Sequence, residues 1–160
     1  MNYTEGDPHE LRQKFWHALE HSPYVMLQLD ADADSAAPMT ASLDEHANHA
    51  IWFFAARDSR FATHGAATVT FSSKGHDLFA RFAGTLSKET DQARLDKQWS
   101  NPVQAWFAGG KTDPNLLFLR MDLGPASIWS SELGLIGTAK MLAGMDVSSD
   151  IKSQHIETTI

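Results

Sequence analysis

The 160-residue sequence contains no cysteine. It can therefore form no disulfide, no thiolate nucleophile and no cysteine-ligated metal centre. It also lacks an apolar run long enough to span a bilayer, so no membrane partner is expected. The first residues, MNYTEGDPHELRQ, show neither the basic nor the apolar region of a signal peptide. This absence predicts a cytoplasmic protein.

Positive charge is also scarce. Thirteen Lys and Arg residues stand against twenty Asp and Glu, which gives a formal net charge of -7. No basic stripe is available to neutralise phosphates, so no nucleic-acid partner is expected. A hydrophobic content of 42% with 21% charged residues predicts a folded chain. We expect one domain over residues 1–145 and a polar tail, mobile or bound to a partner, over residues 146–160.

The hydrophobic pattern predicts short strands with helices around them. Asp7-Pro8 begins a helix that ends near residue 21, and shorter helices are expected after Ser59, over 87–99, over 101–107 and over 133–145. Strands are expected at 24–29, 37–43, 51–56, 67–71 and 77–86, followed by a hairpin of 115–122 with 126–130, broken at Gly124-Pro125. This mainly β (α+β) pattern predicts a small barrel, which removes sheet edges by closing.

The stretch from Ala50 to Lys74 carries the clearest chemistry. An aromatic strand runs into the turn Arg57-Asp58-Ser59-Arg60. Asp58 or Ser59 can cap the start of a short helix. Unpaired N–H groups at a helix start together with a guanidinium suit a phosphate group. An aromatic strand beside them suits a planar ring, so the combination points to a phosphorylated aromatic cofactor. The alternative interpretation is an ordinary strand, a capped turn and an exposed Arg.

Several sequence blocks occur in an order that resembles one family. PMTA, WFF…DSR, SKGHDLFA, WFAGGKTDPNLLFLR and IW, from about Phe15 to about Trp129, are similar to the general stress protein 26 family of pyridoxamine-5′-phosphate-oxidase-like flavoproteins. The resemblance implies a six-stranded split β-barrel with peripheral helices. It also implies a homodimer that binds flavin mononucleotide (FMN) at the subunit interface.

The resemblance also implies which residues bind FMN. Backbone groups of one strand would bind the polar edge of the isoalloxazine, with the aromatic strand beside it, Ser59 and Arg60 at the phosphate and two Trp residues as walls. Phe61 stands where the family commonly has Lys, and Lys74 is a candidate replacement for that charge. The expected cofactor-binding set is Pro38, Met39, Thr40, Ala41, Phe53, Phe54, Ala55, Ser59, Arg60, Lys74, Trp106 and Trp129.

Other chemistry finds less support in the sequence. His46 and His49, with Asp44 and Glu45, lie in the segment DEHANH, which we interpret as a solvated turn and not as a metal site. His76-Asp77 resembles half of a catalytic pair, but no GxSxG motif accompanies it. We assign that pair to the family hairpin.

The sequence therefore identifies no catalytic residue. After Trp129 it lacks the Arg and His that hold the substrate phosphate in true pyridoxamine phosphate oxidases, so that activity is not expected. No GxGxxG motif is present for a bound dinucleotide. We expect an FMN-dependent oxidoreductase acting on an unidentified small molecule, or alternatively a non-catalytic flavin-binding module of a stress response.

Overall fold

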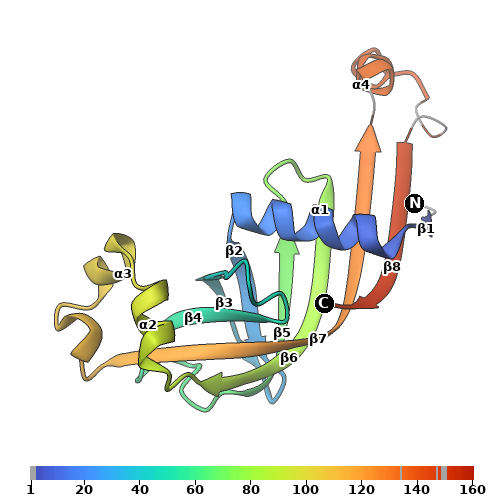
Figure 1. The fold of residues 1–160 in the computed structure, drawn as a ribbon. Coiled ribbons are helices and arrows are strands. Elements are labelled where there is room, and N and C mark those ends of the chain that lie inside the picture. The colour runs from blue at the N-terminus through green and yellow to red at the C-terminus, as the bar shows by residue number, and fades with distance from the viewer. Residues whose placement is uncertain (1–2, 134, 147, 149–150) are drawn as a thin grey trace.

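A computed structural model describes residues 3–160 except 134, 147, 149 and 150. Figure 1 shows one strongly curved sheet crossed by a long helix. The strands are β1 (Thr4–Glu5), β2 (Tyr24–Leu29), β3 (Asp32–Thr40), β4 (Ala50–Ala56), β5 (Gly65–Ser72), β6 (Leu78–Lys88), β7 (Leu116–Leu133) and β8 (Ile151–Thr159). The helices are α1 (Pro8–His21), α2 (Gln92–Gln98), α3 (Asn101–Trp106) and α4 (Leu135–Leu142), with a 3₁₀ turn at Gly110–Thr112.

The fold is mainly β, as the sequence predicts, and the barrel is split. Eight strands form the sheet in the order β1-β8-β7-β6-β5-β2-β3, and β4 pairs with β7 off this path. The count exceeds the predicted six because two further strands, β1 and β8, extend the sheet beyond β7. The sheet does not close, and β3 is left as an edge next to β4. None of the helices in the described part of the chain is long and apolar enough to cross a membrane.

The helix α1 packs across the curved sheet, over β6, β7 and β8 (Figure 1). Asp7 caps it by accepting a hydrogen bond from the Glu10 backbone N–H at 2.8 Å, and Pro8 occupies its first turn. Leu11, Phe15 and Leu19 recur on one face and are fully buried. Their burial joins the helix to the main core inside the barrel.

The hairpin predicted for residues 115–130 is wrong. These residues form the single strand β7, whose first half pairs with β4 and whose second half pairs with β8. The change of neighbour falls between Asp122 and Pro125, where β6 also shifts register near Gly84. A Cβ added at Gly84 would collide with the Asp122 carbonyl oxygen. Gly124-Pro125 therefore bends the strand at a bulge without reversing it.

The polar tail predicted for residues 146–160 joins the sheet instead. β8 pairs with β7 from Pro125↔Thr159 to Leu133↔Ile151, and Ile156 is buried in the main core. Residues 147, 149 and 150 of the predicted tail lie outside the described residues. Together with the second half of β7, β8 forms an arm that extends past the barrel and carries α4 at its tip (Figure 1). The predicted helix at 133–145 is thus present, but it does not close the barrel.

A second, smaller core lies outside the barrel. Residues of β4 alternate between the two cores, so that Ile51 and Phe53 enter the barrel and Trp52 faces the other way. On that side Trp52 packs with residues of α2, α3 and the start of β7, including Leu95 and Phe118. The strand is therefore covered on both faces.

Candidate functional site

The split in the barrel lies between β3 and β4. The two strands are antiparallel neighbours joined by the bridge between Ser42 and Trp52. There the Ser42 N–H donates to the Trp52 carbonyl oxygen at 2.8 Å, and the Trp52 N–H donates to the Ser42 carbonyl oxygen at 3.0 Å. In the described part of the chain, no other backbone pairing joins these strands. The split opens beyond this bridge.

The edge of β3 presents unpaired backbone groups to the split. In an antiparallel strand, successive residues direct their backbone groups to opposite sides. Ala41 donates its N–H to the Pro23 carbonyl oxygen at 2.8 Å, on the β2 side, whereas Ser42 bonds to β4. By this alternation the backbone groups of Met39 point toward β2, while those of Pro38 and Thr40 point toward β4. The Pro38 C=O and the N–H and C=O of Thr40 meet no backbone partner among the residues that the structure describes.

Arg60 spans the other end of the split. Its Nη1 donates to the Asp34 carbonyl oxygen at 3.1 Å and to the Ala36 carbonyl oxygen at 3.5 Å. Both carbonyls belong to even-numbered residues of β3, as the alternation requires. The open backbone groups of Pro38 and Thr40 thus lie between the Ser42–Trp52 bridge and the Arg60 guanidinium.

The short helix predicted after Ser59 is absent, and residues 57–63 form consecutive turns instead. Ser59 still acts as a local cap, because its Oγ accepts a hydrogen bond from the Phe61 N–H at 3.3 Å. The N–H groups of Asp58 and Arg60 find no acceptor in the described residues. The turn therefore offers an anion free N–H groups, the Ser59 hydroxyl proton and the Arg60 guanidinium, but no helix dipole.

Phe61, which stands where the family commonly has Lys, is a core residue. Its side chain is 2% exposed and belongs to the main core. It anchors the turn from inside the barrel, so a charged side chain in the same orientation would be buried at high cost. The sequence difference at this position is thus a packing feature.

The aromatic strand does not form one flat wall. Phe53 is 0% exposed in the main core, and Ala55 beside it is 7% exposed. Phe54 points to the opposite face, where it stacks on Phe118 with ring centroids 4.6 Å apart and planes 20° apart. The backbone groups of Trp52 point to the β3 side, where they bond to Ser42. Phe54 follows two residues later in the strand, so its backbone groups point to the same side, toward the split.

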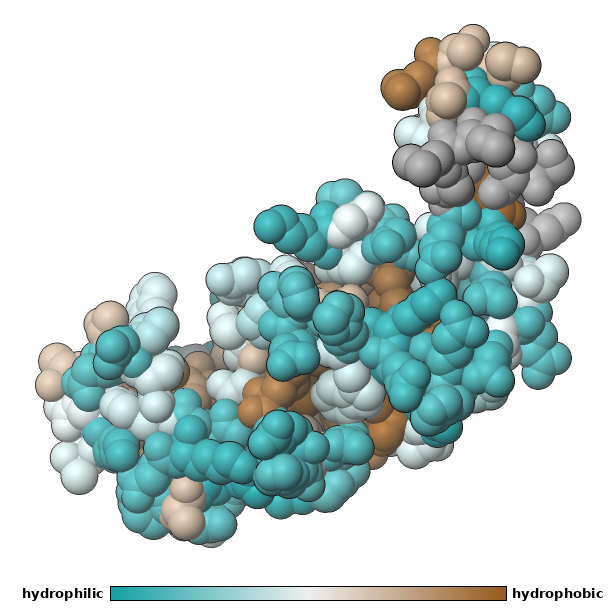
Figure 2. Space-filling model, turned by 45° about the horizontal axis from the view of Figure 1, so that its top comes forward, coloured by the Kyte–Doolittle hydropathy of each residue, from teal (hydrophilic) through white to brown (hydrophobic). Residues whose placement is uncertain are grey.

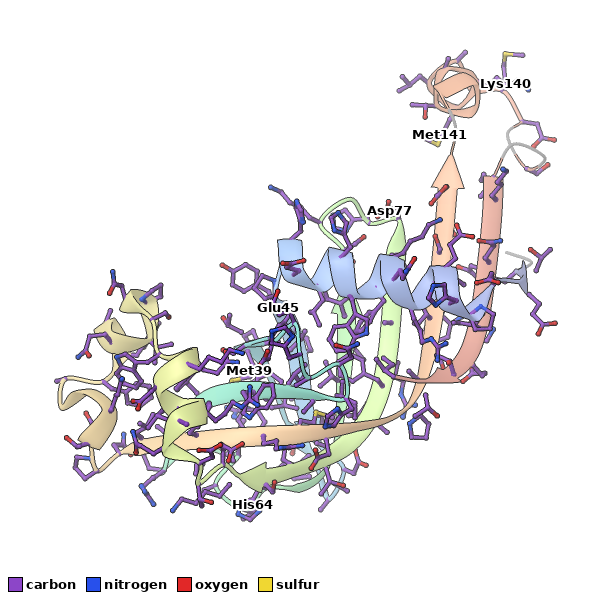
Figure 3. All side chains as sticks on the ribbon, viewed as in Figure 1. Met39, Glu45, His64, Asp77, Lys140 and Met141 are labelled. Atoms are coloured by element: carbon purple, nitrogen blue, oxygen red, sulfur yellow. The ribbon has the colours of Figure 1, made fainter. Side chains whose placement is uncertain are left out.

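Three of the expected site residues lie away from the split within one chain. Lys74 is in the turn after β5, whereas Ser59 and Arg60 are in the turn before it. Figure 3 shows Asp77 and His64, which mark these two turns, at opposite ends of the barrel. Seven residue steps of a strand span about 23 Å. Lys74 therefore does not replace the missing Lys charge within one chain.

The two Trp residues also lie elsewhere. Trp106 is on α3 and is 85% exposed. Trp129 is on the second half of β7, where its ring stacks on His155 with centroids 5.1 Å apart. Within one chain, neither ring lies beside the open backbone groups of β3, where a wall of the flavin site is expected.

The loop after β3 is anchored by a residue that the sequence interpretation placed in a solvated turn. The Asp44 side chain is 2% exposed, and it accepts hydrogen bonds from Lys97 and Arg94 of α2. Lys97 and the His46 backbone N–H hold the pKa of Asp44 well below its ordinary value. The solvated-turn interpretation was wrong for Asp44. Spacing gave no signal, because its partners lie fifty residues later.

A pocket of about 320 Å³ lies at a different place, where β1 meets β8. Its lining residues are Tyr3, Thr4, Glu5, Pro8, His155, Ile156 and Glu157. Two of them are carboxylates, and the His155 ring is paired with Glu157 at 2.8 Å. This lining disfavours a phosphorylated ligand, so the split remains the better candidate site.

Comparison with known proteins places the chain in a family. Residues 10–150 match the model of the pyridoxamine 5′-phosphate oxidase like family. A general stress FMN/FAD binding protein from Xanthomonas citri is 45% identical over 79% of this chain and 93% of its own, with a TM-score of 0.73. A putative general stress protein 26 from Jannaschia is 27% identical over 95% of this chain and 99% of its own, with a TM-score of 0.79.

A putative general stress family protein from Xanthomonas campestris is 41% identical over 80% of this chain and 93% of its own, with a TM-score of 0.69. No protein with curated annotation matches the sequence. The family match covers most of the chain and includes both the PMTA strand and the Ser59–Arg60 turn. The chain belongs to the pyridoxamine 5′-phosphate oxidase-like family.

Proposed function

We propose that this protein is an FMN-binding flavoprotein of the general stress protein 26 type, and that FMN lies along the split between β3 and β4. The observation that carries the proposal is the row of unpaired backbone groups at Pro38 and Thr40, which ends at Arg60. Two relatives with 45% and 27% identity are described as a general stress FMN/FAD binding protein and a putative general stress protein 26.

The open edge of β3 suits the polar edge of a flavin ring. A flavin presents hydrogen-bond acceptors on either side of one N–H donor. Pro38 has no N–H and contributes only an acceptor, while Thr40 contributes both a donor and an acceptor. These groups belong to a strand held by β2, so little order has to be created when the ring binds.

The turn after β4 would hold the phosphate. Ser59 can donate its hydroxyl proton while its oxygen accepts from Phe61. Arg60 uses Nη1 for β3, so its remaining N–H groups are available for phosphate oxygens. Arg60 contacts the same edge of β3 that carries the open backbone groups of Thr40. The phosphate and the ring would therefore bind along one edge of the strand.

The proposal includes a homodimer with FMN at the subunit interface. Paired strands place Ser72, Phe79, Trp129 and His155 in one row across the outer face of the sheet. Phe79 in this row is 43% exposed, and Tyr24 of β2 is 69% exposed. An exposed aromatic face of this kind is typical of a docking surface. A second copy on it would cover the aromatic side chains and bring further residues to each split.

When bound, FMN would supply redox chemistry for an unidentified small molecule, and the chain would orient the ring and exclude water from one face. A non-catalytic flavin-binding module is the second candidate. His76, the histidine of the His76-Asp77 pair, lies in the turn after β5 beside Ser72, at the end of that strand away from Arg60. This placement favours the binding module.

Rapid mixing with reductants separates the two candidates. FMN-loaded protein is mixed with NADH or NADPH while the flavin absorbance is followed. Bleaching well above the rate of free FMN supports the oxidoreductase, and bleaching no faster than free FMN across several reductants supports the binding module. FMN binding itself is tested first by quenching of flavin fluorescence, which should saturate near one FMN per chain.

A further inference from the structure

The Arg60 side chain already has a structural task in the chain without a ligand. Its Nη1 donates to two carbonyl oxygens of β3, those of Asp34 and Ala36. Arg60 itself belongs to the turn that follows β4. The side chain therefore connects two strands that lack ladder hydrogen bonds over this part of the split.

Near this point the buried Ser35 holds β3 to β2, because its Oγ accepts a hydrogen bond from the Leu29 N–H at 2.7 Å, but the side of β3 that faces β4 has few other restraints. β3 pairs with β2, and that pairing shifts register between Leu27 and Leu29, close to the start of β3 where Asp34 lies. The described residues of β3 are otherwise tied to β4 only at the Ser42 bridge, beyond the strand's last residue. An edge strand with one irregular neighbour opens more readily than a strand that is paired on both sides.

We propose that Arg60 is a positioning residue for the flavin ring as well as a phosphate ligand, because it fixes the edge of β3 along which the ring binds. The inference rests on the proposed function and deepens it. A residue that held only phosphate would affect FMN and leave riboflavin, which has no phosphate, unchanged. A residue that also fixes β3 affects the affinity of both ligands.

Two substitutions separate the two roles. Arg60→Ala removes both, so riboflavin affinity should fall about three- to tenfold and FMN affinity further, by about ten- to a hundredfold or more. Arg60→Lys keeps the charge near the phosphate but loses the planar fork that reaches two carbonyls. It should lower riboflavin affinity as Ala does while largely retaining the preference for FMN over riboflavin.

Arg57→Ala is the matched control. Arg57 is an exposed arginine of the same turn, and its side chain makes no hydrogen bond among the residues described. Its removal changes the charge of the turn by the same amount. We expect riboflavin affinity to stay at the wild-type value and FMN affinity to change by less than about threefold.

The experiment combines flavin fluorescence titrations with hydrogen exchange of the ligand-free protein. The β3 amides that bond to β2, such as those of Ala37 and Met39, should exchange faster in both Arg60 variants than in wild type and in Arg57→Ala. Unchanged riboflavin affinity together with unchanged exchange in Arg60→Ala would overturn the inference and leave FMN binding intact. If wild type binds neither flavin, the proposed function fails instead, and the exchange rates alone decide whether Arg60 fixes β3.

Discussion

Lys97 of α2 donates to both carboxylate oxygens of Asp44 at 2.9 Å and so ties the loop after β3 to the second core. Arg94 of the same helix contacts Oδ2 of this carboxylate and lies over the Trp52 ring, 4.4 Å from its centroid. The Ser42–Trp52 bridge, which ends the split, is therefore held from both of its strands.

Replacing Asp44 should destabilise the protein. Asp44→Ala leaves Arg94 and Lys97 without their partner, and because both are partly exposed to solvent we expect a loss of about 1–3 kcal/mol in the free energy of unfolding. Denaturant unfolding at pH 7 measures it. Asp91→Ala, which removes a helix cap on the same helix α2 without touching this network, is a control and should cost about 1 kcal/mol.

The same carboxylate predicts a pH dependence. Its pKa is lowered in the folded protein, so its contribution is fully present above the ordinary value of 3.8 and is lost as the pH falls below it. Between pH 6 and pH 3 wild type should therefore lose more stability than Asp44→Asn. Equal losses in the two proteins would show that the ion pair contributes nothing measurable.

Ile156 tests whether the C-terminal residues belong to the domain. Its side chain is 3% exposed in the main core. Ile156→Ala should lower the free energy of unfolding by about 2–4 kcal/mol because it leaves a cavity. Lys152→Ala, at an exposed position of the same strand, should change it by less than about 0.5 kcal/mol. Similar small effects at both positions would mean that these residues form a loose tail.

Phe79 tests the proposed dimer. It is 43% exposed in the centre of the aromatic row on the outer face of the sheet. Phe79→Glu places a charge there, and light scattering should show the mass of the assembly falling from two chains to one. Leu142→Glu is the control: Leu142 is 82% exposed on α4, where Figure 2 shows apolar side chains at the tip of the arm. A wild-type mass of one chain, or a Phe79→Glu mass of two, would contradict the proposed interface.

Local patterns predicted much of the fold. The Asp7 cap, the β-branched residues of β5 and the aromatic run of β4 specify their own conformations, and these elements form where the sequence indicates. The β7 bend was missed because Gly124-Pro125 is an equally good turn signal. β8 was missed because its residues are polar and only Ile156 and Ser153 are buried, so alternation is weak.

The structure brings only some of the expected site residues together. The PMTA strand and the Ser59–Arg60 turn lie together because β3 and β4 are consecutive antiparallel strands. The chain reverses between them, so the turn after β4 lies beside the beginning of β3. Lys74, Trp106 and Trp129 depend on the curvature of the sheet and on assembly, which no local pattern encodes. The roles of Asp44 and of the Arg60 contact with β3 likewise depend on long-range contacts.

The central claim is that FMN binds along the β3–β4 split, and amide NMR during an FMN titration tests it most directly. The backbone N–H of Thr40 faces the split, and those of Asp58 and Arg60 in the adjoining turn meet no acceptor among the residues that the structure describes. These three amide signals should show the largest shifts and saturate together. The amide signals of Thr4 and Ile156, at the pocket between β1 and β8, should not shift. Large shifts at Thr4 and Ile156 with none at Thr40, or no shifts anywhere at saturating FMN, would contradict the account.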